Sequence, residues 1–368
     1  MPMRVFSFLV IVICMACVDR INIDVGVTTY PVVIDGVISD QPGPYRVDIS
    51  RAFDIESKIT TKTPITAKKV MIIDHTGFSE TLSQIEVGRY QTNANGIRGK
   101  IGGVYKIRVE LLDGKIYESV PDTILSPGSI ESVYFKFKSD KDVNDAVTYG
   151  FDIFFNSVAA EKNSNQFLWK FVGTYKTVTN PELYTVSCGE SRCPRPLPCS
   201  AFDVASDGSL QKVRPCVCCE CWVNYFNDNP LVSDNQFVEG GKFNRIKVGY
   251  VPVNQWTFID KVHAEVRQQS LTKHAFDFWR AIESQKAATS SLFQPISGKI
   301  PRSFVQLAGA EAPVEGIFYA TGISSKAIFI TRYDVPDQRY IPEQNLPYPD
   351  ACVKLFPFSS TTQPSYWR

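Results

Sequence analysis

The chain has 368 residues and carries 39 Lys and Arg against 38 Asp and Glu, which gives a formal net charge of +1. Proteins that bind nucleic acids concentrate positive charge, so this balance argues against a nucleic-acid partner. Hydrophobic residues make up 44% of the chain and aromatic residues 12%, which excludes a mostly disordered protein, and the length leaves room for two domains.

Residues 1–16 predict an export signal. A short basic start precedes an apolar run that ends at Ile13, and the small residue Ala16 stands directly before Cys17. Because a membrane-spanning helix takes about 20 apolar residues, we interpret this shorter run as a cleaved signal peptide. A cysteine in this position is typical of bacterial lipoproteins, in which the thiol receives a diacylglycerol. We therefore expect lipidation at Cys17 and a lipid-anchored tether over residues 17–28, with a secreted protein that keeps Cys17 as a structural thiol as the alternative.

Residues 29–124 predict a β-sandwich of immunoglobulin-like kind. Tyr45–Ser50 alternates strictly between apolar and polar residues, as a half-buried strand does. Tyr105–Leu111 and Lys115–Ser119 flank Asp113-Gly114, a dipeptide that favours a tight hairpin turn. Short strands without an intervening helix are typical of such a sandwich, and a Pro-Gly turn marks its end. Further β-rich runs cover residues 31–38, 69–74 and 88–90.

Residues 125–368 predict a larger β-rich domain that contains one amphipathic helix near residues 271–288. Ser270 or Thr272 can cap this helix. Four apolar residues follow at helical spacing, namely Ala275, Phe278, Trp279 and Ile282. We expect the aromatic residues among them to pack on a sheet rather than to bind a cofactor. The predicted strands cover residues 130–137, 149–155, 166–175, 245–251, 257–266, 318–321 and 327–331.

Eight cysteines follow Cys17 and predict a disulfide framework, because exported proteins meet an oxidising compartment. All but Cys352 lie within residues 188–221, whose prolines exclude a central strand or a helix, so we expect a disulfide-stapled insertion there. If all eight pair, Cys352 must bond to this cluster and tie the C-terminal tail to it. Adjacent Cys218 and Cys219 should not bond each other, because the ring that they would close is strained. The eight are Cys188, Cys193, Cys199, Cys216, Cys218, Cys219, Cys221 and Cys352.

Two other interpretations of the cysteine cluster stay open. The segment Cys216–Cys221 contains two overlapping C-x-x-C spacings, which are also found in zinc sites, and a redox-active pair is a third interpretation. No histidine lies nearby to complete a mixed zinc site. We expect disulfides, and neither a metal nor a cofactor.

No motif in the chain predicts catalysis. The sequence holds no P-loop, no G-x-S-x-G, no H-E-x-x-H and no dinucleotide-binding glycine pattern. Its histidines, His75, His263 and His274, fall in a predicted turn, a predicted strand and a helix start, without a partner motif. We therefore expect a non-catalytic protein, with a secreted hydrolase as an alternative.

Aromatic residues beside the cysteine cluster are the candidate ligand-binding residues. Trp222, Tyr225 and Phe226 offer rigid aromatic faces that suit a glycan or a peptide. The alternative is that they are buried support for the disulfides.

Five segments spread over the chain carry a family pattern: Val32–Ile38, Gly88–Tyr90, Gly103–Val109, Val266–Trp279 and Pro364–Trp367. In this order they resemble a family of Bacteroidota lipoproteins catalogued as domain of unknown function 4249. The resemblance covers nearly the whole mature chain, and its motifs are turns and strand cores, so it brings no catalytic residues.

The resemblance implies an outer-membrane lipoprotein at the cell surface. Such a protein is expected to work beside a TonB-dependent transporter barrel as an accessory subunit that captures a nutrient or caps the barrel. A structural subunit of an outer-membrane assembly or export complex is the alternative from another functional class.

Overall fold

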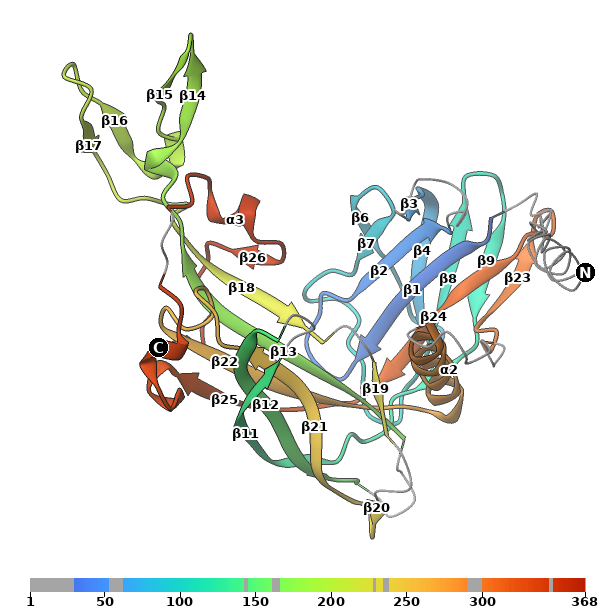
Figure 1. Ribbon diagram of the computed structural model, residues 1–368. Coiled ribbons are helices and arrows are strands. Elements are labelled where there is room, and N and C mark those ends of the chain that lie inside the picture. The colour runs from blue at the N-terminus through green and yellow to red at the C-terminus, as the bar shows by residue number, and fades with distance from the viewer. Residues whose placement is uncertain are drawn as a thin grey trace, which may run out of the picture.

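The computed structural model describes residues 30–52, 62–141, 145–160, 166–227, 230–233, 238–289, 300–343 and 347–367. The fold is mainly β, as predicted, with several sheets, a long helix and disulfide-linked cysteines (Figure 1). The predicted signal peptide, Cys17 and the tether lie outside the described residues. In the part of the chain that the structure describes, no helix is both long and apolar enough to cross a membrane.

The first unit of the fold consists of two sheets around one hydrophobic core. Its strands are β1 (Val32–Ser39), β2 (Arg46–Arg51), β3 (Thr63–Pro64), β4 (Ala67–Asp74), β5 (Ser79–Thr81), β6 (Ser83–Glu86), β7 (Arg89–Gln91), β8 (Val104–Leu111), β9 (Ile116–Ser119), β10 (Asp122–Thr123), β23 (Phe304–Ala308) and β24 (Val314–Thr321). One sheet has the order β24-β1-β2-β7-β6 with β3 beside β2, and the other has the order β23-β9-β8-β4-β5 with β10 beside β8. The strand predicted over Tyr105–Leu111 is confirmed as β8, in which the buried residues Ile107 and Val109 alternate with the partly exposed residues Lys106 and Arg108.

Two strands from far along the chain complete the first unit. β24 pairs in parallel with β1, from Val32 opposite Val314 to Ser39 opposite Thr321, and β23 pairs with β9. A division of the chain at residue 124 therefore separates β1 from its partner, because a parallel pair needs a long connection that leaves no local signal. The immunoglobulin-like character expected for residues 29–124 stays a prediction, since this sandwich includes strands from outside that range.

The second unit also contains two packed sheets. Its strands are β11 (Ser129–Lys141), β12 (Val147–Val158), β13 (Phe167–Val178), β18 (Glu220–Phe226), β19 (Leu231–Val232), β20 (Val238–Glu239), β21 (Lys242–Pro252), β22 (Lys261–Ser270), β25 (Ile323–Thr331) and β26 (Ser359–Ser360). Sheet C has the order β11-β12-β21-β20, and sheet D has the order β25-β22-β13-β18-β26 with β19 beside β13. Aromatic residues of both sheets fill the core, among them Phe151, Phe155 and Trp169. The indole N–H of Trp169 donates to Oε1 of Gln268 at 2.7 Å, so this buried donor is satisfied.

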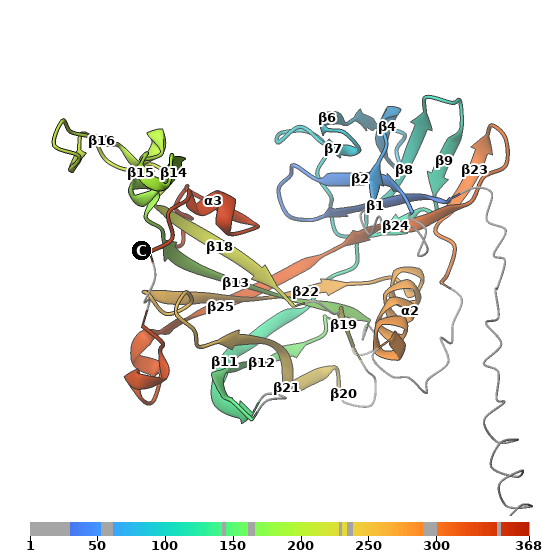
Figure 2. The same ribbon diagram turned by 45° about the horizontal axis from the view of Figure 1, so that its top comes forward.

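Helix α2 (Lys273–Thr289) joins the two units and confirms the predicted helix. The hydroxyl of Thr272 accepts the backbone N–H of Ala275 at 3.4 Å, as a cap does. The side chains of Ala275 and Phe278 pack with Ile317 of β24 and Leu168 of β13. Figure 2 shows α2 beneath β24, at the ends of β13 and β22. The apolar side of α2 therefore packs on strands of both units, which agrees with the prediction that its aromatic residues pack on a sheet.

A buried carboxylate fixes the junction between the units. Asp122 of β10 is 4% exposed and accepts hydrogen bonds from the hydroxyl of Thr272 at 2.6 Å, from Ala320 N at 2.9 Å and from Thr123 N at 3.0 Å. Burial raises the pKa of Asp122, and the three donors oppose that rise. One side chain thus connects β10 and β24 of the first unit with the start of α2.

The cysteine-rich segment forms an arm that stands away from the rest of the molecule (Figure 1). It contains two hairpins and two short 3-10 helices: β14 (Thr185–Cys188) with β15 (Ser191–Pro194), β16 (Phe202–Val204) with β17 (Leu210–Lys212), η1 (Pro181–Leu183) and η2 (Pro198–Ser200). Three disulfides hold it, Cys188–Cys193, Cys199–Cys218 and Cys216–Cys219. Adjacent Cys218 and Cys219 bond different partners, as the ring-strain argument predicts.

The fourth disulfide ties the C-terminal segment to sheet D. Cys221 of β18 bonds Cys352 at the start of helix α3 (Cys352–Leu355), so the C-terminal tail is fastened beside the cluster. All eight sulfurs are therefore paired. The predicted insertion over residues 188–221 differs at its end, because β18 begins at Glu220 and is an inner strand of sheet D. No proline lies within β18, so the argument against a central strand holds only for the residues before it, which form the short hairpins of the arm. Two further 3-10 helices, η4 (Arg332–Asp334) and η5 (Gln338–Tyr340), follow β25.

Candidate binding site

The three aromatic residues predicted to bind a ligand all lie on β18, but they face different surroundings. Tyr225 points into the sandwich, where its ring centroid lies 5.7 Å from that of Phe171 and 5.9 Å from that of Tyr175. Burial raises the pKa of the Tyr225 phenol well above its usual range. This residue belongs to the core, in line with the alternative that the sequence left open.

Trp222 supports the C-terminal segment. It is 7% exposed, and its ring meets that of Trp367 edge to face with centroids 6.5 Å apart. The amino group of Lys176 lies 5.9 Å from the Trp222 ring. The last described residues therefore cover Trp222, and the tail closes this part of the outer face of sheet D.

Phe226 is the member of the set that borders a cavity. It is 51% exposed and lines a cavity of about 680 Å³ at the open edge between sheets C and D. Pockets of this size bind drug-sized ligands. We call this cavity the seam pocket. Its lining residues are Phe171, Phe226, Asn227, Pro230, Leu231, Lys247, Val248, Gly249, Tyr250, Glu283 and Ala287.

The seam pocket exists because the edge of sheet D is interrupted. β18 pairs with β13 from Val172 onward and β19 pairs with Leu168 and Trp169, so the two strands leave a notch between them. At this notch the side chain of Asn227 accepts the backbone N–H of Phe171 at 3.3 Å. On the opposite side of the seam pocket, β21 passes close to Phe171, since a Cβ at Gly249 would lie 2.4 Å from the Phe171 ring. A glycine is therefore needed where the strand passes this ring.

The wall of the seam pocket combines an apolar floor with a polar rim. Glu283 of α2 accepts the backbone N–H of Val232 at 3.1 Å, which holds its carboxylate at the rim. The amino group of Lys247 lies 2.6 Å from Oδ1 of Asp152. Burial raises the pKa of Tyr250, and the carboxylates of Asp140 and Asp152 raise it further. Such a wall suits a ligand with one apolar face and several hydrogen-bonding groups.

The same wall is poorly equipped for catalysis. Its described residues include one carboxylate, Glu283, and no histidine, serine or cysteine. Hydrolysis of a glycosidic bond ordinarily uses two carboxyl groups, and acyl transfer uses a nucleophile beside a base. The geometry of the seam pocket therefore favours binding.

Most of the seam pocket could not be found from the sequence. Lys247, Tyr250 and Glu283 come from a strand and a helix that the sequence does predict, but no local pattern shows that they face Phe226. The residue pair Asn227 and Pro230, which follows the aromatic run of β18, is the one sequence signal of a strand break at this place.

A second, larger cavity of about 1110 Å³ lies between β1, β24 and α2. Its floor is apolar and includes Val33, Phe278 and Ile282. The carboxylate of Asp35 at its rim is already paired with Lys62, at 3.3 Å. None of the residues predicted to bind a ligand lines this cavity.

Acid should loosen the C-terminal segment where it covers sheet D. His263 of β22 is 7% exposed and stacks on Tyr366, with ring centroids 4.1 Å apart. Burial lowers the pKa of His263, an effect that Glu265 opposes and Arg267 reinforces. A histidine with a depressed pKa in the folded state contributes stability above its unfolded pKa, and this contribution is lost as the pH falls through the folded pKa. We therefore expect the melting temperature of His263→Phe to fall less than that of the wild type between pH 7 and pH 5.

The matched control for this prediction is His75→Phe, at an exposed turn after β4. The test is to measure the melting temperatures of the wild type, His263→Phe and His75→Phe across the same pH range. Equal acid sensitivity of His263→Phe and the wild type would show that His263 does not cause the loss.

A family model described as "Domain of unknown function (DUF4249)" matches residues 18–327. The match spans both units and the arm and ends within β25, so α3 and the C-terminal tail lie beyond it. No curated protein matches the sequence.

Proposed function

The chain belongs to the DUF4249 family, and from this premise we propose that it is a lipid-anchored, non-catalytic binding subunit that works beside a TonB-dependent transporter barrel in the outer membrane. The observation that carries the proposal is the seam pocket, which has an apolar floor, a polar rim and a single carboxylate. Such a pocket suits capture of a glycan or a peptide that the barrel then imports.

The disulfides support a place outside the cytoplasm. All eight cysteines after Cys17 are paired, and structural disulfides persist in oxidising compartments. The sequence before them supplies an export signal and a cysteine at the expected lipidation position. Together these features support a lipid-anchored protein at the outer membrane.

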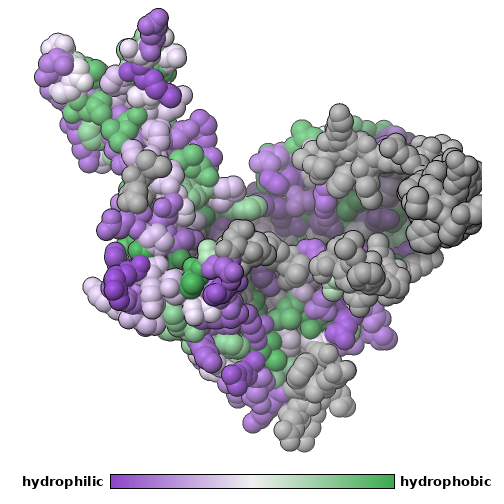
Figure 3. Space-filling view, in the orientation of Figure 1, coloured by the Kyte–Doolittle hydropathy of each residue, from purple (hydrophilic) through white to green (hydrophobic). Residues whose placement is uncertain are grey.

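Exposed apolar residues on the arm support the proposal that the protein contacts a partner protein. Three of its valines are exposed, Val204 to 44%, Val213 to 58% and Val217 to 69%. In Figure 3 hydrophobic residues appear among hydrophilic ones on the arm. Exposed apolar side chains that gather in one patch are typical of a contact surface. We assign this surface to the barrel.

Cys17→Ser should move the protein from the membrane to the soluble fraction. Each buried methylene of an acyl chain contributes about 0.8 kcal/mol of membrane binding, so loss of the chains removes the anchor. The measurement is fractionation of native cells with a C-terminal tag, followed by solubilisation in mild detergent and mass spectrometry of what co-purifies. Cys188→Ser, in the arm hairpin, is the matched control and should stay in the membrane fraction.

The expected result for the wild type is a TonB-dependent barrel in stoichiometric amount. Recovery of assembly or export machinery instead would favour a structural subunit and overturn the proposal. Turnover of a glycan or peptide panel that Glu283→Gln abolishes would show a hydrolase and would also overturn it.

A further inference from the structure

The outer face of sheet C carries a regular array of aromatic and charged side chains. Paired residues on neighbouring strands share a face of the sheet, and so does every second residue along a strand. Phe151, Ile153 and Phe155 of β12 are fully buried in the core, so the residues between them face outward. Two cross-strand rows result, one of Tyr134, Phe154 and Lys247, and the next of Lys136, Asp152 and Tyr250. We call these six residues the aromatic face.

The rings of the aromatic face offer apolar surface to a ligand. Tyr134 and Phe154 stand side by side, with centroids 5.7 Å apart and planes 16° apart. The ring of Tyr250 lies across Gly150, because a Cβ at Gly150 would be 2.2 Å from Cζ of Tyr250. A ring that lies over a glycine presents its face outward. The apolar face of a sugar ring packs on such a surface, and aromatic side chains provide it at low entropic cost.

Positive charge surrounds these rings. Lys247 is paired with Asp152 at 2.6 Å, and Lys138, the next residue on this side of β11, is paired with Asp140. Lys136 belongs to the second row, and Arg245 lies at an irregularity of β21, where its backbone N–H donates to Oδ1 of Asn156 at 2.7 Å. Both are exposed, and neither side chain has a carboxylate partner among the described residues. The chain as a whole has a formal charge of only +1, so an unpaired excess here is a local feature. Charge complementarity therefore favours an anionic ligand.

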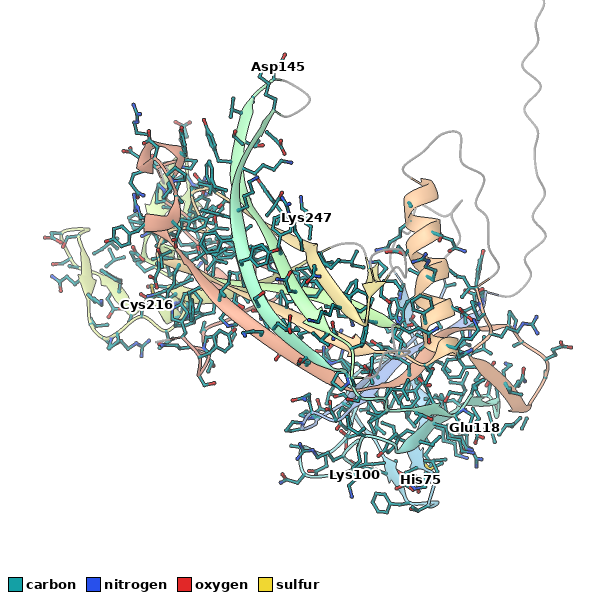
Figure 4. The ribbon with its side chains drawn as sticks, turned by 90° about the horizontal axis from the view of Figure 1, so that it is seen from below. His75, Lys100, Glu118, Asp145, Cys216 and Lys247 are labelled. Atoms are coloured by element: carbon teal, nitrogen blue, oxygen red, sulfur yellow. A yellow bond between two sulfur atoms is a disulfide. The ribbon has the colours of Figure 1, made fainter. Side chains whose placement is uncertain are left out.

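The aromatic face is continuous with the seam pocket. Lys247 and Tyr250 belong to both, since they line the cavity and lie at the end of the two rows. Figure 4 places Lys247 on β21 beside the β11–β12 hairpin, whose tip carries Asp145. In Figure 3 mainly hydrophilic residues, with some hydrophobic ones, cover the part of the molecule where β11, β12 and β21 lie in Figure 1. A chain-like ligand on this face reaches the pocket at the edge of β21.

The geometry points to a binding surface for an anionic glycan, which lies across the aromatic face and places one sugar in the seam pocket. Sugar rings match the aromatic side chains, and acidic groups match Lys136 and Arg245. Four disulfides favour a compartment that holds acidic polysaccharides rather than nucleic acids, the other polyanions that stack on aromatic side chains. The inference rests on the proposed function in placing the protein outside the cytoplasm and in treating the seam pocket as a binding site, but it does not depend on the barrel.

Alginate oligosaccharides are the probe that tests it, with neutral dextran oligosaccharides and single-stranded DNA as comparators. Binding is measured by titration calorimetry on the purified full-length protein in mild detergent, without any barrel. We expect alginate to bind and both comparators to bind at least about tenfold more weakly, a difference of about 1.4 kcal/mol. Failure of co-purification with a barrel leaves this result untouched, so the two proposals fail independently.

Two variants locate the site. Lys136→Gln combined with Arg245→Gln should weaken alginate binding about tenfold at low salt and flatten its salt dependence, because screened charge attraction is what is lost. Tyr250→Ala should weaken binding by a similar factor that does not change with salt, because it removes stacking. Lys69→Gln and Phe78→Ala, on the first unit, are the matched controls and should bind like the wild type.

Melting temperatures of all variants show whether each is folded. Equal binding of DNA and alginate would show that any polyanion suffices, and equal binding of dextran would show that the charge is irrelevant. Either result, no alginate binding at all, or variants that match their controls would overturn the inference.

Discussion

Replacing Cys221 and Cys352 together by serine should lower the free energy of unfolding by about 5 kcal/mol in the chain-entropy account of disulfides. The bond joins residues separated by 131 positions, whereas the other three disulfides span 5, 19 and 3. Its loss therefore releases the most conformational freedom in the unfolded chain. Both cysteines are fully buried in an apolar cluster, so the serines would also place two hydroxyls there. The backbone N–H of Cys352 donates to the carbonyl of Cys218 at 3.1 Å, and this hydrogen bond does not need the sulfur.

Denaturant unfolding followed by tryptophan fluorescence measures this change. The matched control is the pair Cys188→Ser and Cys193→Ser, whose disulfide closes one exposed hairpin of the arm and should change global unfolding little. A reductant should reproduce the large effect, and a chelator should have none. Destabilisation by chelator alone would show that the cysteines hold a metal, as metal-held domains unfold when the ion is removed.

Asp122→Ala should cost about 3 kcal/mol of stability, because it leaves buried donors without an acceptor. The side chain accepts from Thr272, Ala320 and Thr123, which belong to the helix start, to β24 and to β10. The first unit and its contact with the start of α2 should lose stability together, because the carboxylate joins them.

The control variants for Asp122 separate hydrogen bonding from charge. Asp122→Asn keeps an acceptor oxygen but turns an amide N–H₂ toward one donor, so it should cost less than Asp122→Ala. Asp113→Ala, in the exposed hairpin turn between β8 and β9, should stay within about 1 kcal/mol of the wild type. The measurement is the free energy of unfolding of each variant, obtained from denaturant titration. An Asp122→Ala variant as stable as Asp113→Ala would show that the junction does not depend on this carboxylate.

Local patterns were sufficient for elements whose character is set within a few residues. The alternation of Tyr45–Ser50 predicted β2, and the spacing of Ala275 and Phe278 predicted α2. The number of cysteines predicted that all eight pair and that Cys352 reaches back to the cluster. Each of these predictions depends on periodicity or on counting, which a sequence displays directly.

The sequence did not show which strands pair with each other. The strand predicted over residues 318–321 was assigned to the second unit, yet the observed strand β24 (Val314–Thr321) pairs with β1, because no local pattern shows which sheet edge a strand joins. The same limit applies to the seam pocket. Trp222, Tyr225 and Phe226 are neighbours in the sequence, but the alternation of β18 and the tail above it leave only Phe226 at a cavity. That result needed the notch beside β13 and the position of β21, and both are tertiary features.

The return of β24 to β1 determines when the molecule can finish folding. A ribosome delivers the chain from its N-terminus, so β1 leaves the tunnel long before Val314–Thr321 exists. Until then one edge of β1 has no neighbour, and an open strand edge is a template for pairing with other chains. The first unit therefore cannot mature as an early, independent product of translation. It is completed only when Val314–Thr321 reaches β1, after the second unit and the arm have been made, so β1 keeps an open edge until late in folding.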